Sequence, residues 1–355
     1  MPHADPVLGE RLARHGFADR PAQTVLDAVR LTTAVQSQDP VAGRLGVRSR
    51  NATATDADVH RAIEIDRTVV KTTVMRATIH LVAATDVRWL TALTGPGIAR
   101  SFRSRWAGLG LDVPLLERAA AQIPTVLTGG PATRAEIMDR LDESGVHIDR
   151  SDPAAATHVL LAATTQGLVC RGPDRRRDAT FVLVDEWLPG APAGPAGDDA
   201  LAELARRYFA AFSPATAADF ATWSGLPSTR AIGLIRDELT PTDVHGRAGY
   251  RLGHVEPATG IRLLSGFDNY LVGYRHRGFI SDERRPEVYV GGIIRSTVLV
   301  DGRIAGRWQL VRSGDGYTAD VIAFESFTPK LRRGLDAEVD DLVRFLDAPV
   351  TLSLS

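Results

Sequence analysis

Two glutamines separated by one residue form the most unusual polar pair in the sequence. Gln36 and Gln38 flank Ser37 and are followed by Asp39-Pro40. Each side-chain amide offers donors and an acceptor and does not titrate. The preceding residues predict a helix up to the start of this run, which Asp-Pro then stops. Two glutamines that leave a helical face there can point together into a cleft. The alternative is an ordinary polar helix terminus before a proline.

Familiar catalytic signatures do not occur in the sequence. It contains no P-loop, no Gly-x-Ser-x-Gly elbow, no G-x-G-x-x-G between strand and helix, and no histidine pair at metal-ligand spacing. The single cysteine, Cys170, excludes a disulfide framework and a cysteine-based zinc site within one chain. We therefore expect no metal and no cofactor. Because Lys71 and Lys330 are the only lysines, lyase chemistry through an amine is not expected either.

Arginine carries almost all of the positive charge and is unevenly distributed. The 355 residues have a net charge of −1, and two of the 42 basic residues are lysines. Residues 262–312 contain nine arginines against five acids, whereas residues 336–347 contain five acids and one arginine. Smaller arginine clusters lie at 100–105 and 171–178. A GC-rich gene would explain the ratio of arginine to lysine, but not this clustering, which favours contact with phosphates.

Three weakly similar segments, starting at Pro21, Pro131 and Pro214, each predict the start of a helix. In the last two a threonine precedes an acid by two or three residues, which suits a capped first turn. The second segment continues into a helix up to about residue 166 and a hairpin of residues 168–171 and 180–184. The third repeats this order. Helix, turn, helix and two-stranded wing is the order of a winged helix.

The resulting prediction is an α+β protein with three tandem winged helix-turn-helix units and a β-rich C-terminal region. Longer helices at 85–106 and 198–212 join the units, and a final helix is expected at 329–346. The expected parts are 1–110 with the two glutamines, 111–190, 198–260, and the β-rich region 261–355.

Four ordered motifs resemble the AlkZ-like winged-helix DNA glycosylases, and they span about residues 8–308. They are Gln36 to Arg50, Met75 to Val82, Leu264 to Arg277, and Val300 to Trp308. The resemblance implies three winged helices around a concave, basic surface for duplex DNA, with two glutamines and a β-hairpin in the cleft. It also implies hydrolytic release of bulky N7-alkylguanines, including interstrand crosslinks left by genotoxic natural products. Ser37 departs from the family's often apolar middle position, and Gln38 favours the crosslink-unhooking branch.

The resemblance implies that Gln36 and Gln38 are the catalytic residues. It places the hairpin at about residues 279–294, with Arg284 and Arg285 at its tip. Asp268 is expected to pair with Arg275 or Arg277, and His80 is either a core histidine or a cleft residue. The residues expected to contact DNA are Arg44, Arg48, Arg50, Arg76, His80, Arg275, Arg277, Arg284 and Arg285.

Duplex DNA carrying an alkylated guanine is the expected partner of a monomeric, cytoplasmic protein. No association with a membrane is expected, because no apolar run approaches about 20 residues and the first residues lack signal-peptide character. Two other functions remain open. A winged-helix transcription regulator would bind DNA without chemistry and would usually dimerise, and a scaffold would use its winged helices for protein contacts.

Overall fold

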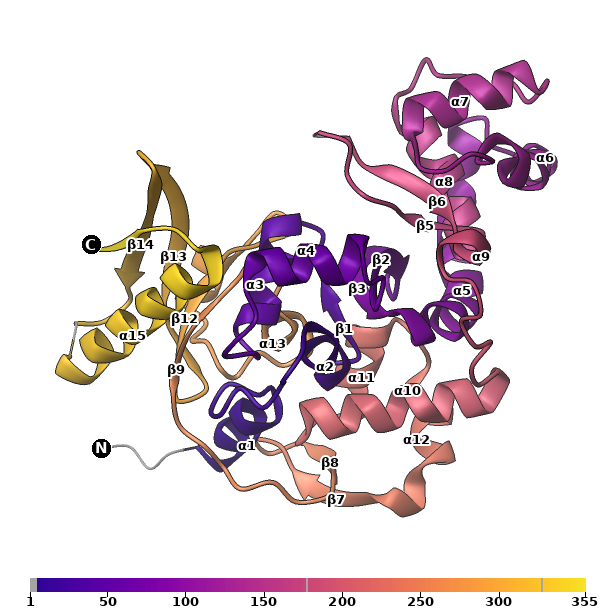
Figure 1. Ribbon diagram of the computed structural model, residues 1–355. Coiled ribbons are helices and arrows are strands. Elements are labelled where there is room, and N and C mark those ends of the chain that lie inside the picture. The colour runs from indigo at the N-terminus through magenta and orange to yellow at the C-terminus, as the bar shows by residue number, and fades with distance from the viewer. Residues whose placement is uncertain (1–4, 177, 327) are drawn as a thin grey trace. The chain divides into compact units, whose positions relative to one another are not determined.

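The computed structural model describes residues 5–176, 178–326 and 328–355 (Figure 1). The chain divides into two compact units. One unit comprises residues 61–201, and the other combines the chain up to His60 with Ala202–Ser355. Both contain helices and strands, so the predicted α+β class is confirmed. No helix within the described residues combines the length and apolar character that a membrane span requires.

The unit of residues 61–201 contains a hairpin, a long helix and a second set of helices and strands. The long helix α5 (Val87–Gly108) follows the antiparallel hairpin of β2 (Val69–Val74) and β3 (Thr78–Ala83). In the second set, the sheet has the strand order β4-β6-β5. The elements of this set are α6 (Val113–Val126), β4 (Ala132–Thr133), α7 (Arg134–Glu143), α8 (Ala154–Thr165), β5 (Val169–Arg171), β6 (Thr180–Leu183) and α9 (Val184–Trp187). The hairpin predicted at 168–184 is thereby confirmed.

The other unit begins with four short elements and continues after residue 201. Its first elements are α1 (Pro6–Arg14), α2 (Val25–Leu31), β1 (Ala34–Gln36) and α3 (Pro40–Arg48), with α4 (Asp56–Glu64) at the boundary. The continuation consists of α10 (Gly197–Phe212), α11 (Ala217–Ser224), α12 (Ser228–Leu234), β7 (Leu239–Asp243) and β8 (Ala248–Leu252).

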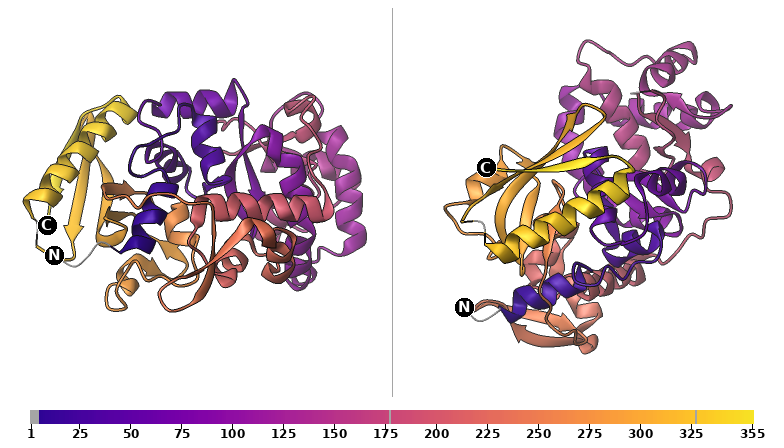
Figure 2. Two further views of the ribbon diagram at one scale, coloured as in Figure 1. Left: turned by 90° about the horizontal axis from the view of Figure 1, so that it is seen from below. Right: turned by 60° about the vertical axis from the view of Figure 1, so that its left-hand side comes forward.

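A five-stranded sheet forms the C-terminal part of this unit, with the order β15-β14-β13-β12-β9. All neighbours are antiparallel except β14 and β15. The helix α15 (Pro329–Leu346) packs on β9 and β15 and so crosses the sheet between its edges (Figure 2). The strands are β9 (Ile261–Leu264), β12 (Thr297–Val300), β13 (Arg303–Ser313), β14 (Gly316–Ala323) and β15 (Val350–Leu354). The predicted β-rich region and final helix are present.

Capping boxes start the helices of the three weakly similar segments. The caps are Thr24, Thr133 and Thr216, whose hydroxyls each accept from the third helical amide while the acid there accepts from the cap's own amide. Each cap satisfies two orphan donors. By element order, however, the counterpart of α7 near the N-terminus is α3, because β1 and α3 follow each other as β4 and α7 do.

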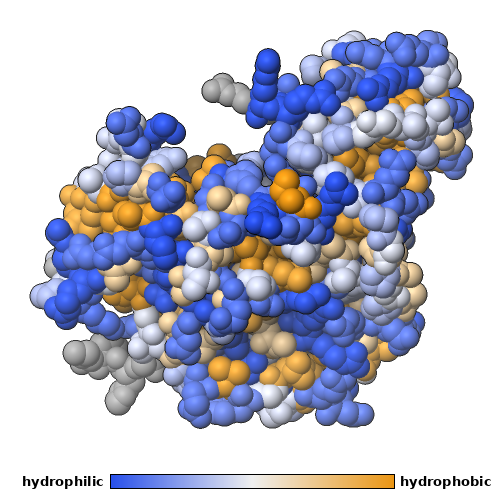
Figure 3. Space-filling model, viewed as in Figure 1, coloured by the Kyte–Doolittle hydropathy of each residue, from blue (hydrophilic) through white to orange (hydrophobic). Residues whose placement is uncertain are grey.

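The face shown in Figure 3 is mostly hydrophilic, with separate hydrophobic areas, one of which lies over β13 and β14. In the larger unit, which combines the chain up to His60 with residues 202–355, buried ion pairs between arginines and carboxylates join segments that are distant in sequence. Arg50 donates to both carboxylate oxygens of Asp268, at 2.8 and 2.9 Å, and neither side chain is exposed. Arg48 contacts Glu338 at 3.0 Å and Asp341 at 2.8 Å, which ties α3 to α15.

A chain of hydrogen bonds extends from Arg50 through the buried aromatic side chains. Tyr274 donates its hydroxyl proton to the Phe212 carbonyl at 3.1 Å, so His15 Nε2–H donates to Tyr274 at 3.1 Å and His15 Nδ1 accepts from Arg50 at 3.4 Å. Burial, with help from Arg50 and Arg11, holds the pKa of His15 well below its usual value. A neutral imidazole is the form that this direction of donation requires.

Removing the Asp268 carboxylate should destabilise the protein strongly, because the Arg50 guanidinium would stay buried without its counter-ion. We expect Asp268→Ala to lower the free energy of unfolding by about 3 to 5 kcal/mol, measured by guanidinium titration. The control is Asp336→Ala, which breaks the exposed Arg332–Asp336 pair and should cost less than about 1 kcal/mol. Equal losses in the two variants would contradict the structural importance of the buried pair.

Candidate functional site

The two glutamines lie at the junction between β1 and α3, not at the end of a helix. Gln36 ends β1 and is 5% exposed, Ser37 is buried, and Gln38 is exposed in the turn before α3. The predicted helix up to Val35 is wrong, because α2 ends at Leu31. Thr33, which has the left-handed φ of 70°, separates that helix from the strand, and helical propensity does not reveal such a turn.

Asp39-Pro40 starts a helix here instead of stopping one. The Asp39 carboxylate accepts from the amides of Val41 at 2.8 Å and Ala42 at 3.2 Å, so it caps α3. Pro40 occupies the first helical position, where its missing amide proton costs nothing. The pair Asp-Pro therefore holds the glutamine turn by fixing the start of α3 directly after it.

Glycines on α3 let the helix approach the glutamine segment closely. A Cβ atom at Gly43 would come within 2.3 Å of the Ser37 hydroxyl, and one at Gly46 within 2.9 Å of a Val35 methyl. Real side chains do not make such contacts, so both positions need glycine for this packing. Ser37 is small enough to fit against Gly43. The close approach fixes the backbone between Gln36 and Gln38 relative to α3.

The side chain of Asn269 holds the other side of this segment. Its Nδ2 donates to the Ala34 carbonyl at 2.6 Å, and its Oδ1 accepts from the Gln36 amide at 3.3 Å. Asn269 starts the short helix α13 (Asn269–Val272), which Asp268 caps. The motif that contains Asn269 thus holds the motif that contains the glutamines. Asn269 was not among the expected site residues, although it lies beside Asp268 in the sequence.

The structure gives Asp268, Arg48 and Arg50 different roles from those expected. Asp268 pairs with Arg50 and not with Arg275, whose amide instead donates to Asp219 at 2.7 Å. Arg48 and Arg50 are fully buried and bind carboxylates. They therefore stabilise the fold in this structure and do not present their guanidinium groups to DNA. Their burial depends on partners more than 200 residues away in sequence, which local patterns cannot reveal.

In the unit of residues 61–201, His80 is buried and Arg76 occupies the turn between β2 and β3. His80 Nδ1 lies 2.9 Å from the Thr78 carbonyl. Burial, with a contribution from Arg76, lowers the pKa of His80 to about 3. His80 is therefore a neutral core histidine and not a cationic contact. Burial also lowers the pKa of Arg76, whose side chain is half-buried.

The remaining expected arginines lie at or near the surface of the larger unit. Arg44 is half-buried and pairs with Asp56 at 2.6 Å. Arg277 is half-buried, with its guanidinium 3.7 Å from the Tyr289 ring centre. Arg275 and Arg284 are exposed, and Arg285 is half-buried.

A hairpin is present in the expected region, but its tip is not formed by arginines. β10 (Tyr289–Val290) pairs with β11 (Ile293–Ile294), and Gly291 and Gly292 make the turn with φ of 55° and 88°. A two-residue turn with two positive φ angles favours a Gly-Gly pair. Arg284 and Arg285 precede the hairpin, at the start of α14 (Arg285–Val288). The expected position of these arginines at the tip is therefore wrong.

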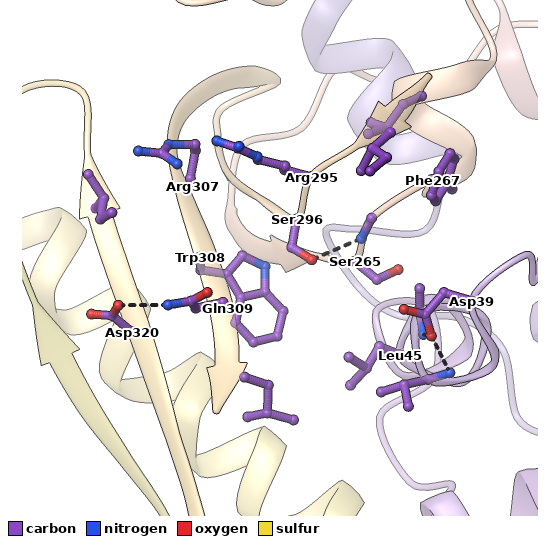
Figure 4. A pocket seen from close by; sticks show the side chains of 17 residues that line it. Asp39, Leu45, Ser265, Phe267, Arg295, Ser296, Arg307, Trp308, Gln309 and Asp320 are labelled. Carbon is purple, nitrogen blue, oxygen red and sulfur yellow. Dashed lines mark hydrogen bonds between the residues drawn. The ribbon is translucent and has the colours of Figure 1, made fainter. Parts of the chain in front are cut away.

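A cavity of about 550 Å³ lies beside the glutamine turn (Figure 4). It is bounded by the first half of α3, the loop around Phe267, the segment after the hairpin turn, and β13 and β14. Trp308 forms part of its wall and donates to the Leu264 carbonyl at 2.8 Å, while Arg295 and Arg307 approach from the same side. Asp39, which directly follows Gln38, also lines it. Neither Gln36 nor Gln38 is among the residues that line it, so the cavity meets the glutamine turn only at Asp39.

The described residues contain no group of three or more His, Cys, Asp or Glu side chains that could hold a metal ion. Cys170 is buried, and burial raises the pKa of its thiol to about 12. A thiol with so high a pKa is a poor nucleophile. The non-titrating glutamines are therefore stronger candidates for a catalytic role than the Cys170 thiol.

A family model described as DNA glycosylase AlkZ-like matches residues 29–345. The chain belongs to the AlkZ-like family. Among curated proteins, the interstrand DNA cross-link repair glycosylase of Streptomyces sahachiroi is 31% identical over 328 residues, covering 86% of this chain and 87% of that protein. The solved structure of Streptomyces sahachiroi DNA glycosylase AlkZ matches with a TM-score of 0.84 and 25% identity over 98% of both chains. The expected family is confirmed, and the protein is a DNA glycosylase.

The Asn269 side chain should control local opening around the catalytic candidate of this glycosylase. In Asn269→Ala, the Ala34 carbonyl and the Gln36 amide lose their partner, so we expect faster hydrogen exchange in a peptide covering residues 34–38. Hydrogen–deuterium exchange with mass spectrometry measures this. A peptide from β13 and β14 serves as the internal control and should keep its protection. Unchanged exchange at residues 34–38 would show that Asn269 does not hold the segment.

Proposed function

We propose that this glycosylase hydrolyses the N-glycosidic bond of bulky N7-alkylguanines and unhooks interstrand crosslinks in duplex DNA. The observation that carries the proposal is the Gln36-Ser37-Gln38 turn, which is held by α3 and Asn269 and is followed by Asp39 in the wall of a cavity. The name of the crosslink-repair relative from Streptomyces sahachiroi supports the same substrate class. In the cell, the activity would serve self-resistance to a genotoxic natural product.

The chemistry of the substrate explains why glutamines suffice. Alkylation at N7 places a positive charge on guanine, so the base leaves with the bonding electrons as a neutral molecule and needs no proton. Water adds to C1′ of the sugar as the bond to N9 breaks, and its proton passes to solvent. Positive charge develops on the sugar in such transition states. Amide carbonyls can orient the water and stabilise this charge.

Gln36 and Gln38 contribute to this reaction from different environments. The side chain of Gln38 is exposed, so we assign it contact with the attacking water or the deoxyribose. Gln36 is buried, and its backbone is held by Asn269. We assign to its amide the second interaction with the reacting sugar. Neither side chain changes charge near neutral pH, which restricts the site to lesions that are already activated.

The architecture that we propose for DNA binding is three winged helices and a β-rich region around a concave, basic cleft. The orders β1-α3-α4-β2-β3, β4-α7-α8-β5-β6 and α11-α12-β7-β8 each match helix, helix and wing. The parts that we propose for this architecture are residues 1–110, 111–190, 198–260 and 261–355. Exposed Arg275 and Arg284 and half-buried Arg44, Arg76, Arg277 and Arg285 are the proposed contacts of a monomer with duplex DNA.

Removal of either glutamine amide should slow excision without weakening DNA binding. We expect Gln36→Ala and Gln38→Ala each to lose about 2 to 4 kcal/mol of transition-state stabilisation. Single-turnover release of N7-methylguanine from a duplex measures the rate, and fluorescence anisotropy measures binding. Gln23→Ala is the matched control, because Gln23 is exposed and lies outside the turn. Wild-type rates in both test variants would leave the glutamines a purely structural role, whereas no release by the wild type would contradict the proposed substrate class.

Excision should depend little on pH and should leave an intact abasic strand. Because glutamine does not titrate, the rate on N7-methylguanine should change less than about twofold between about pH 6 and 8. Uracil, a neutral and poor leaving group, should stay in the duplex. The assay compares both duplexes across this range, with and without alkali, and adds borohydride to trap a Schiff base. Rapid uracil release, a titration limb near pH 6.5 or a trapped adduct would each contradict the mechanism.

A further inference from the structure

The hairpin of β10 and β11 is too short to hold its own position. Each strand contributes two residues, with Tyr289 opposite Ile294 and Val290 opposite Ile293. An isolated two-stranded hairpin is marginally stable at best in water. Contacts with the rest of the unit must therefore determine where its tip lies.

The hairpin and the start of α3 line the same cavity. Ile293 and Ile294 belong to its walls, and so does Asp39, which directly follows Gln38. Ile293 is 60% exposed and Val290 is 38% exposed, so the tip presents apolar side chains that a ligand can cover. DNA that contacts both the hairpin and the glutamine turn meets them at a spacing that the protein has to fix.

The Tyr289 hydroxyl ties the first strand of the hairpin to α13. It donates to the Leu271 carbonyl at 2.9 Å, and Leu271 is completely buried. The last carbonyls of a helix have no intrahelical donor, so this bond satisfies a backbone group that needs a partner when buried. Burial raises the pKa of Tyr289 above its usual value, so the hydroxyl keeps its proton at neutral pH.

Two further contacts restrain the hairpin. The Arg277 guanidinium lies 3.7 Å from the centre of the Tyr289 ring, a cation–π contact that holds the ring itself. Beyond the second strand, the Ser296 hydroxyl accepts from the Gly266 amide at 3.0 Å (Figure 4). Among these three contacts, the bond from the Tyr289 hydroxyl is the one that reaches α13.

The helix α13 also carries Asn269, two residues before Leu271. The Asn269 side chain binds the Ala34 carbonyl and the Gln36 amide. We propose that Tyr289 is a positioning residue of the glycosylase, which holds the hairpin at a fixed distance from the glutamine turn through α13. The inference rests on the proposed function, because it needs the glutamines to act on the sugar. A misplacement of about 1 Å can cost about a hundredfold in rate, so this hydroxyl affects the reaction without contact with the substrate.

The variant Tyr289→Phe keeps the ring beside Arg277 and removes the hydroxyl alone. We expect the single-turnover release of N7-methylguanine, at saturating enzyme, to fall about tenfold, while the Kd for the duplex stays within about twofold. A tenfold loss corresponds to about 1.4 kcal/mol, which is within the range for a lost hydrogen bond that leaves a buried acceptor unsatisfied. A residue that only stabilises the fold would lower the melting temperature without this split between rate and binding.

Two further variants test the path through α13. In the matched control Tyr208→Phe, the lost hydroxyl donates at 2.9 Å to the carbonyl of Gly273, the residue after α13, but it comes from α10 and not from the hairpin. This variant should stay within about twofold of the wild-type rate. Asn269→Ala breaks the path between α13 and the glutamine turn. In that background Tyr289→Phe should slow release by less than about twofold further, because losses along one shared path are not additive.

The outcomes separate the two proposals. If the wild type releases no base, or if Gln36→Ala and Gln38→Ala release it at the wild-type rate, the proposed function fails. If the glutamine variants are slow but Tyr289→Phe is not, the inference alone is wrong. An equal loss in Tyr208→Phe, or additive losses of Tyr289→Phe and Asn269→Ala, would also overturn it. A loss that Tyr208→Phe does not share, and that disappears in the Asn269→Ala background, supports it.

Discussion

The buried pair of Arg50 and Asp268 is the interaction on which the candidate site depends. Asp268 receives two hydrogen bonds from Arg50 and also caps α13. The next residue, Asn269, binds the backbone on both sides of Val35. The ion pair therefore places the asparagine, and the asparagine places the first glutamine. A buried pair of charges is costly to desolvate, but here it connects the loop before α13 with the end of α3.

This arrangement suits a candidate site whose proposed catalytic groups are uncharged. Glutamine side chains gain no orientation from ionic attraction, so their aim depends strongly on the backbone that carries them. The backbone is restrained from one side by the glycines of α3 and from the other by Asn269. Preorganised dipoles stabilise developing charge without reorganisation during the reaction. In the mechanism that we propose, the restrained turn supplies that preorganisation, which two amides could not provide on a flexible loop.

The sequence was sufficient to predict features that depend on local chemistry. The capped helix starts at Thr133 and Thr216, the hairpin after Gly167 and the helix from Pro329 all result from short-range patterns that the structure retains. The strand at Ala34–Gln36 was missed because three residues carry little periodic signal. The burial of Arg48 and Arg50 was missed because their carboxylates come from other parts of the chain. The Gly-Gly pair at 291–292 is a local signal for the turn of this hairpin, whereas the neighbouring arginines carry no preference for a turn.

The hydrogen bond between Gln36 and Asn269 spans 233 positions of the chain, and the whole unit of residues 61–201 is made between them. During synthesis on the ribosome, the N-terminal segment therefore emerges long before the residue that fixes it. Contacts of such long range form late in folding, and domains generally fold in order of their synthesis. The glutamine turn can reach its final geometry only after α13 has left the exit tunnel. A nascent or truncated chain that ends before Asn269 would thus lack the two hydrogen bonds that hold the turn, so the proposed catalytic geometry is confined to protein whose translation has passed this point.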